Sequence, residues 1–264
     1  MSQMIEVVHG SRVAVVWLNR PEIHNALNEE MVAQLTQAIH DSSHDPETVA
    51  VVLASRGDAF CAGVDLAWYQ RYWEQGGHSS QAPARALAHL LKTIDCSPVP
   101  VIARVNGHCI GAGIGLVAAC DMAFASHDAE FSQPETGLGL VPQLVAPYLS
   151  RAIGARTAGR WLMMGETFPA AEAWRMGLLQ EICEASELDA RINAVLGHLM
   201  LTEPNAVRLT REMLKSLPGG ELDHAQLTAK LEQFAPRVDS PAREGVNAFI
   251  EKRWPDWVPD ELKS

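Results

Sequence analysis

Short apolar runs alternate with amphipathic segments along the first part of the chain. Four runs are typical of buried strands, and they are residues 13–18, 49–54, 98–105 and 121–126. Between the first two runs, Met31, Leu35 and Ile39 recur at helical spacing, and Asn28 is placed to cap that helix. After residue 142 the pattern is almost wholly helical, apart from a further strand predicted at 178–182. Alternating strands and helices predict an α/β core at residues 1–200 and a C-terminal helical region at residues 201–264.

Composition narrows the classes of function. The 264 residues carry a formal net charge of -11, which argues against nucleic acid or an anionic membrane as the main partner. No apolar stretch of about 18 residues is present, so no transmembrane helix is expected, and residues 1–12 show no signal-peptide pattern. Five cysteines without close pairing predict no disulfide framework and favour a reducing cytoplasm. No CxxC or HExxH motif occurs, so we expect no metal site.

A glycine-rich turn at residues 107–115 follows one predicted strand and opens a helix. Backbone N–H groups at such a helix start point outward at the positive end of the dipole, which suits an oxyanion or a phosphate. Tight packing of the helix on the strand explains the glycines equally well. A dinucleotide fingerprint fails, because Leu116 stands where the third glycine belongs. The turn also fits a nucleophile elbow with Cys109 as the nucleophile of an α/β hydrolase, although a free cysteine is more often a small buried side chain.

Two further segments could carry chemistry. Residues 57–66 form a second strand-to-helix turn, in which Gly63 permits an unusual backbone angle. Two such turns could aim two N–H groups at one carbonyl oxygen. In residues 131–140, Glu135 stands among apolar and small residues, where lost solvation would raise its pKa towards neutrality. An exposed loop glutamate is the simpler alternative for Glu135.

Six segments together resemble the enoyl-CoA hydratase/isomerase (crotonase) superfamily in order and spacing. They are LNRP at 18–21, NALN at 25–28, AFCAGVDL at 59–66, NG with the following glycines from 106, CD at 120–121 and FSQPETGLG at 131–139. The likeness continues at residues 244–253 and covers nearly the whole chain. It implies a core of repeated ββα units, a C-terminal helical region, and trimers that often pair into hexamers. It also implies an acyl-CoA substrate and no separate cofactor.

The resemblance also assigns residues. Glu135 would be the acid/base, and the backbone N–H groups of Val64 and Ala112 would form an oxyanion hole for the thioester carbonyl. Phe249 and Lys252 would reach coenzyme A, often from a neighbouring subunit. The positions that would contact coenzyme A or the acyl chain are His24, Ala26, Ala62, Asp65, Leu66, Ala67, Trp68, Gly111, Gly115, Phe249 and Lys252. Trp68 and Tyr69 begin the helix that borders the acyl pocket, and core packing explains one of them equally well.

The chain departs from the family at two places. The second catalytic glutamate of many hydratases aligns with Gly115, which has no side chain to hold water. One alternative is therefore a double-bond isomerase with Glu135 alone, and another is a hydratase that uses Glu135 with a substrate group or another residue. The segment PQLVAPYL at 142–149 replaces the usual Pro-Gly-x-Gly-Gly stretch. Together with DLAW at 65–68 and Gly115, this version is similar to bacterial hydratases of branched glutaconyl-CoA thioesters and also to enzymes of polyketide β-branching.

These departures favour hydration, or the reverse dehydration, of a branched and carboxylated enoyl-CoA. Isomerisation remains the runner-up. A Cys109 hydrolase and a non-catalytic acyl-CoA binder are more remote alternatives.

Overall fold

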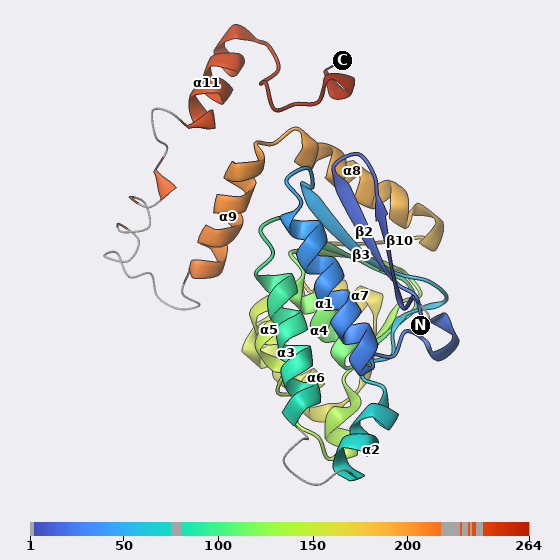
Figure 1. Ribbon diagram of the computed structural model, residues 1–264. Coiled ribbons are helices and arrows are strands. Elements are labelled where there is room, and N and C mark those ends of the chain that lie inside the picture. Colours follow the sequence, from blue (N-terminus) through green and yellow to red (C-terminus); the bar gives the residue numbers. More distant parts are fainter. Residues whose placement is uncertain are drawn as a thin grey trace. The chain divides into compact units, whose positions relative to one another are not determined.

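A computed structural model describes residues 3–74, 81–217, 228, 232, 234–235 and 240–263. The chain divides into two compact units, Met1–Ile192 and Asn193–Ser264, and Figure 1 colours them along the sequence. The division falls inside helix α8 (Leu188–Met200), whereas the sequence places the end of the core at residue 200.

The first unit contains a six-stranded sheet with the order β1-β2-β3-β5-β7-β10. Its strands are β1 (Ile5–His9), β2 (Val13–Leu18), β3 (Ala50–Ser55), β5 (Val101–Val105), β7 (Met122–Ser126) and β10 (Glu181–Cys183). β1 pairs antiparallel with β2, and the other pairs are parallel. All six residues of β3 are buried, as expected for a central strand of a parallel sheet. The four strands predicted from apolar runs are therefore confirmed as β2, β3, β5 and β7.

A smaller sheet has the order β4-β6-β8-β9. Its strands are β4 (Ala59–Cys61), β6 (His108–Ile110), β8 (Glu130–Ser132) and β9 (Thr167–Pro169). The first three run parallel, and each follows a strand of the large sheet after a short turn: β3 leads to β4, β5 to β6 and β7 to β8. A helical segment follows each pair, so the predicted α/β class with repeated ββα units is confirmed.

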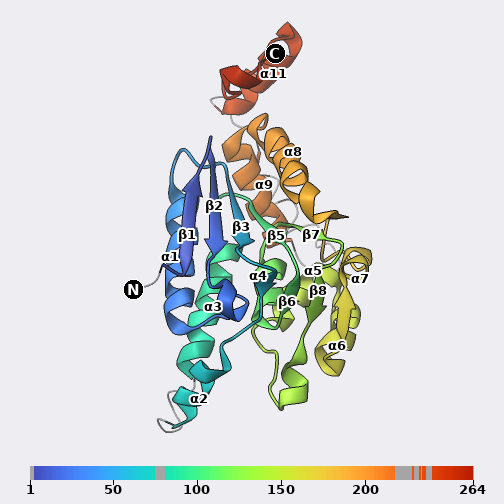
Figure 2. The same ribbon diagram turned by 90° about the vertical axis from the view of Figure 1, so that its right-hand side faces the viewer.

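Helices complete the first unit. They are α1 (Glu29–His44), α2 (Leu66–Glu74), α3 (Gln81–Asp95), α4 (Ala112–Ala119), α5 (Ala146–Ile153), α6 (Ala155–Met164) and α7 (Ala170–Arg175). The Asn28 side chain accepts a hydrogen bond from the Met31 N–H at 2.8 Å, so the predicted cap of α1 is confirmed. Helix α1 packs on β1, β2 and β3 and against α3, and Figure 2 shows both helices behind the large sheet. The hydrophobic core lies between the large sheet and these two helices, where Leu35 of α1, Leu53 of β3 and Leu90 of α3 are fully buried.

The second unit is helical in the residues that the structure describes. It holds the end of α8, α9 (Pro204–Ser216) and α11 (Pro241–Glu251). Glu203 caps α9 by accepting bonds from two N–H groups of its first turn. The Trp257 indole donates to the Leu201 carbonyl at 3.2 Å. In the described part of the chain, no helix has the length and the apolar content that crossing a membrane requires.

Candidate active site

Three segments of the chain meet where parallel strands β4, β6 and β8 end. Residues 62–64 follow β4, residues 111–112 follow β6 and residues 133–135 follow β8. Because these strands are parallel neighbours, their carboxyl ends lie at one edge of the small sheet. We call these three segments the strand-end side. The two glycine turns and the glutamate that the sequence presents separately therefore share one place.

Two glycines allow the three segments to approach closely. Gly63 and Gly111 have φ of +86° and +55°, in the left-handed region that favours glycine. A Cβ atom at Gly63 would lie 3.0 Å from the Ile110 carbonyl oxygen. A Cβ atom at Gly111 would lie 2.8 Å from Oε1 of Glu135. Backbone conformation and space therefore both restrict these positions to glycine, and Gly111 lies against the candidate acid/base.

Two backbone N–H groups at these turns stay outside the hydrogen-bond ladders. Val64 forms a parallel bridge with Leu27. That bridge uses the Leu27 N–H, which donates to the Gly63 carbonyl at 2.8 Å, and the Asp65 N–H, which donates to the Leu27 carbonyl at 2.9 Å. The Val64 N–H takes part in neither bond. Ala112 is the first residue of α4, so its N–H has no acceptor within that helix.

Glu135 lies in the first turn of a 3-10 helix, η2 (Pro134–Leu138). Burial raises the pKa of Glu135 above its ordinary value of 4.5, and the backbone N–H of Glu135 and the Gln133 side chain oppose that shift. Its Oε2 atom is buried and makes no hydrogen bond with the described residues. A carboxyl group in this setting exchanges protons closer to neutral pH than an exposed one. The alternative of an exposed loop glutamate does not hold.

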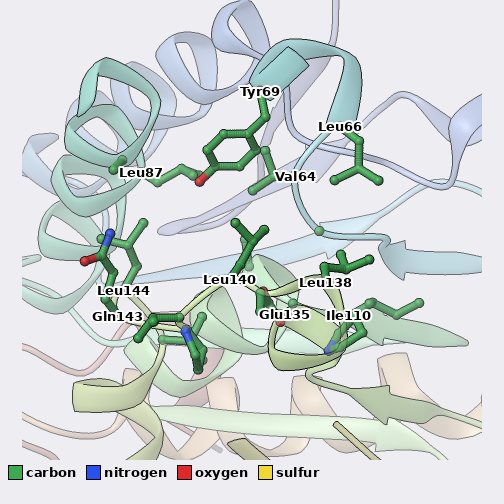
Figure 3. A pocket seen from close by; sticks show the side chains of 18 of the residues that line it. Val64, Leu66, Tyr69, Leu87, Ile110, Glu135, Leu138, Leu140, Gln143 and Leu144 are labelled. Carbon is green, nitrogen blue, oxygen red and sulfur yellow. The ribbon is translucent and has the colours of Figure 1, made fainter. Parts of the chain in front are cut away.

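A pocket of about 440 Å³ opens over the strand-end side. Its other wall, which we call the helical wall, comprises Leu66, Tyr69, Ala84 and Leu87 of α2 and α3 together with residues 140–145. In Figure 3 Tyr69 and Glu135 lie on opposite sides of the pocket, and Leu140 points between them. Among the described residues that line the pocket, polar side chains belong to Tyr69, Glu135 and Gln143.

The structure gathers part of the predicted set around this pocket. Its lining includes Ala62, Val64, Leu66, Gly111 and Ala112, together with Glu135. Position 115 adjoins the pocket through Val145, because a Cβ atom there would lie 3.1 Å from Val145 Cγ2 and 3.4 Å from Leu91 Cδ1. An apolar wall thus occupies the direction in which a side chain at Gly115 would extend.

Other predicted residues surround the turn after β4. Asp65 accepts a bond from the Ala67 N–H at 3.1 Å, which is the capping role open to it from sequence. Arg20 lies 3.5 Å from the Asp65 carboxylate and donates to the Ala26 carbonyl at 2.9 Å. His24 is exposed and lies 3.5 Å from the Asp58 carboxylate. These contacts hold the loop that precedes α1 against the turn at Gly63.

Trp68 and Tyr69 have different places. Trp68 is 1% exposed and belongs to the hydrophobic core, which favours the packing role that the sequence leaves open for one of the two residues. Tyr69 lines the pocket instead, although it was not among the assigned site residues. Its signal was helical spacing, because Leu66 and Tyr69 stand three residues apart and share a face of α2. Burial and the charge of Glu135 raise the Tyr69 pKa, which keeps the hydroxyl neutral.

Phe249, Lys252 and Cys109 are the remaining residues that the sequence singled out. Phe249, 85% exposed, lies on α11, and Lys252 ends that helix in a left-handed conformation. Both belong to the second unit, so their contact with coenzyme A stays a prediction. Cys109 is fully buried in β6, and burial raises its pKa well above the ordinary value. A buried neutral thiol does not suit the nucleophile of a hydrolase.

The sequence and the fold of this chain are both similar to those of enzymes of one family. The family described as "Enoyl-CoA hydratase/isomerase" matches residues 9–260. The chain is 31% identical to the short-chain-enoyl-CoA hydratase of Clostridium acetobutylicum, over 92% of each protein. It is 30% identical to the mevalonyl-coenzyme A hydratase of Aspergillus fumigatus, over 95% of this chain and 93% of that protein. The crystal structure of an enoyl-CoA hydratase from Shewanella pealeana superposes with a TM-score of 0.92 at 31% identity, over 97% of this chain and 96% of that one.

Proposed function

The chain belongs to the enoyl-CoA hydratase/isomerase family, and on that premise we propose that it adds water across the double bond of an enoyl-CoA thioester. One observation carries the proposal. The Val64 N–H, the Ala112 N–H and the partly buried Glu135 converge at the ends of three parallel strands, beside a pocket with a largely apolar lining. Two donors and one proton carrier suit a reaction that passes through a thioester enolate.

The proposed mechanism assigns one task to each group. The Val64 and Ala112 N–H groups donate to the thioester oxygen and stabilise the negative charge that develops there. The oxygen of water forms a bond to the β-carbon of the acyl chain while Glu135 takes one of its protons. Glu135 then delivers a proton to the α-carbon, the enolate collapses to the thioester, and the carboxylate is restored. The product is a 3-hydroxyacyl-CoA.

Substitution of Glu135 tests this assignment. Glu135→Gln keeps the shape of the side chain but removes its proton transfer, so turnover should fall by about 10²–10⁴-fold. Binding of a saturated acyl-CoA should change little. Glu130→Gln is the matched control, because Glu130 is a half-exposed glutamate of β8 outside the pocket lining. Near-normal hydration by Glu135→Gln would refute the proposed role.

Double-bond isomerisation is the second candidate function. It is favoured by the fact that Glu135 is the one acidic side chain among the described residues that line the pocket. A single carboxyl group can remove a proton from one carbon and return it to another. The two functions differ in their product, since isomerisation moves the double bond and adds no oxygen.

The acyl group is a finer part of the proposal. Gly115 supports a branched, carboxylated chain, because it removes a negative charge that would repel a substrate carboxylate. The described lining offers no Lys, Arg or His to pair with that carboxylate. Relatives named for short-chain-enoyl-CoA and mevalonyl-coenzyme A differ in acyl group, so family membership leaves this choice open. Turnover that falls when the distal carboxylate is replaced by a methyl group would support the carboxylated chain.

We also propose that the chain assembles as a trimer or a hexamer. Exposed apolar side chains in the first unit support a contact between subunits, and they include Met163, Met164 and Trp174. Light scattering coupled to gel filtration tests this, because a monomer at micromolar concentration would contradict it.

A further inference from the structure

Two consecutive residues in the loop before α1 have left-handed backbone angles. His24 and Asn25 have φ of +53° and +56°, a region in which residues other than glycine are uncommon. Strain of this kind persists only where surrounding contacts fix the backbone, and it gathers at functional sites. The loop is therefore held in this conformation by its contacts with other segments.

The Asn25 side chain is fully buried and ties the loop to the turn between β3 and β4. Its Nδ2 group donates to the Arg56 and Ala59 carbonyls, each at 2.9 Å. Its Oδ1 atom accepts from the Arg20 N–H at 2.8 Å. A buried amide needs such partners, because burial without them costs free energy. Since β4 runs from Ala59 straight to the strand-end side, the Asn25 side chain fixes the loop against the strand that leads there.

The main chain of the same loop holds the turn that follows β4. The Ala62 N–H donates to the carbonyl of the strained His24 at 2.8 Å. The Leu27 main chain bonds to both neighbours of Val64, at 2.8 and 2.9 Å. The turn is thus bonded to the loop before and after Val64, and neither bond uses the Val64 N–H. The loop fixes the direction of that N–H without occupying it.

Resting on the proposed function, we infer that Asn25 is a positioning residue for the oxyanion hole. It lies outside the described pocket lining, so it acts through the loop and the turn and not on the substrate. Its side chain holds the loop, the loop holds both neighbours of Val64, and the Val64 N–H then points at the thioester oxygen. Asparagine suits this place because it tolerates a left-handed angle and also has two N–H donors for two carbonyls.

Three substitutions separate the contributions of Asn25. Asn25→Ala removes the side-chain bonds and disfavours the left-handed angle, so kcat should fall by about 10²-fold on every enoyl-CoA, the effect of a displacement of roughly 1 Å. Asn25→Gly keeps the angle and loses only the bonds, so its loss should be smaller. Asn25→Asp turns both donors into acceptors that face carbonyls, and it should lose as much as Asn25→Ala. KM should change much less than kcat, because the oxyanion develops in the transition state.

An optical signal reports the oxyanion hole without turnover. In 4-dimethylaminocinnamoyl-CoA the amine is conjugated with the thioester carbonyl, and hydrogen bonds to the carbonyl oxygen shift the absorption to longer wavelength. The parent should show this shift on binding, Asn25→Gly should lose part of it, and Asn25→Ala should lose most of it. Asn28→Ala is the matched control, because the Asn28 side chain caps α1 and bonds to Met31 instead of to the turn. It should lower the melting temperature and leave the shift and kcat unchanged.

The outcomes distinguish this inference from the proposed reaction. A folded variant, Asn25→Ala or Asn25→Gly, that keeps the full shift and the parent kcat would overturn the inference, since Asn25 would then serve stability alone. A parent that shows the shift but hydrates nothing would refute the proposed reaction, and loss of the shift in the variants would still support the role of Asn25. A parent that binds the probe without any shift would overturn the inference, because Asn25 would have no oxyanion hole to position.

Discussion

The strand-end side and the helical wall enclose the same pocket but are built differently. The strand-end side depends on backbone: Gly63 and Gly111 hold left-handed angles so that N–H groups and Glu135 meet at one point. The helical wall depends on side chains, such as Leu87 and Leu140, that two helices and a loop place around open space. A change in the first should therefore alter the reaction with every substrate. A change in the second should alter the choice among substrates.

Among substitutions that compare the two sides of the pocket, the largest effect is expected from Gly111→Ala. The added Cβ would lie 2.8 Å from Oε1 of Glu135, and alanine disfavours the φ of +55° at this position. Both Glu135 and the neighbouring Ala112 N–H should shift, so turnover should fall by about 10²–10³-fold on every enoyl-CoA. Steady-state assays against a chain-length series measure this. Gly137→Ala is the control, because nothing lies within 4 Å of a Cβ there. A loss of turnover with only some substrates would mean that the strand-end side also selects among substrates, contrary to the roles assigned above.

A moderate effect is expected from Leu140→Ala on the helical wall. Leu140 points into the pocket, and its truncation frees the volume of about three carbon atoms. The ratio of kcat/KM for longer or branched chains to that for short chains should rise by about 4-fold for each methylene that enters the new space, because a buried methylene contributes about 0.8 kcal/mol. Competition between two substrates in one reaction measures the ratio. Leu214→Ala, at an exposed leucine of α9, should leave it unchanged. An equal loss of kcat/KM with all acyl chains would mean that Leu140 supports the reaction itself and not the choice of substrate.

A smaller effect, on stability, is expected at Gly115, where an added Cβ atom would lie against Val145 of the helical wall. A Cβ there would meet Val145 at 3.1 Å, and such crowding costs about 1–3 kcal/mol. The higher helix propensity of alanine returns up to about 1 kcal/mol. Gly115→Ala should therefore lower the free energy of unfolding by about 1 kcal/mol. In a variant that also carries Val145→Ala, the crowding between the two side chains is relieved, so the double variant should lose less stability than the sum of the two single changes. At Gly159 on α6, the nearest atom to an added Cβ would be Cε of Met163 at 3.7 Å, so Gly159→Ala should raise the free energy of unfolding. Additive effects of the two changes would show that the contact is not tight.

The smallest effect is a dependence of stability on pH. The folded-state pKa of Glu135 is raised, so its contribution to stability is present below the unfolded pKa and is lost as pH rises through the folded value, above 4.5. Glu135→Gln avoids that loss. Its melting temperature should exceed that of the parent at neutral pH, by more than Glu130→Gln achieves, and the difference should shrink in acid. Thermal melts from pH 4 to pH 8 measure it. A constant difference would mean that burial does not disfavour the carboxylate.

Sequence patterns predicted the long elements well because these depend on local periodicity. Runs of apolar residues identified β2, β3, β5 and β7, and Asn28 identified the start of α1. The short strands β4, β6, β8 and β9 have three residues each, too few for any alternation to appear. Yet these strands bring the two turns and Glu135 together. That convergence depends on pairing between distant segments, which periodicity does not report.

The helical wall was harder to predict for a related reason. Trp68 and Tyr69 are neighbours in sequence, and only the rotation of α2 decides that Trp68 enters the core while Tyr69 lines the pocket. Helical spacing relates the pocket face of Leu66 to Tyr69, but it does not say which face meets the pocket. Gln143 lies in a loop without periodicity, so its position follows from tertiary packing alone.

The central claim is that water is added to an enoyl-CoA at Glu135. The most direct measurement is mass spectrometry of the product formed by the parent enzyme in water enriched in oxygen-18. Hydration at Glu135 predicts a 3-hydroxyacyl-CoA that carries one heavy oxygen on its β-carbon, with almost none formed by Glu135→Gln. A product that has a shifted double bond and contains no heavy oxygen would refute hydration and establish the isomerase.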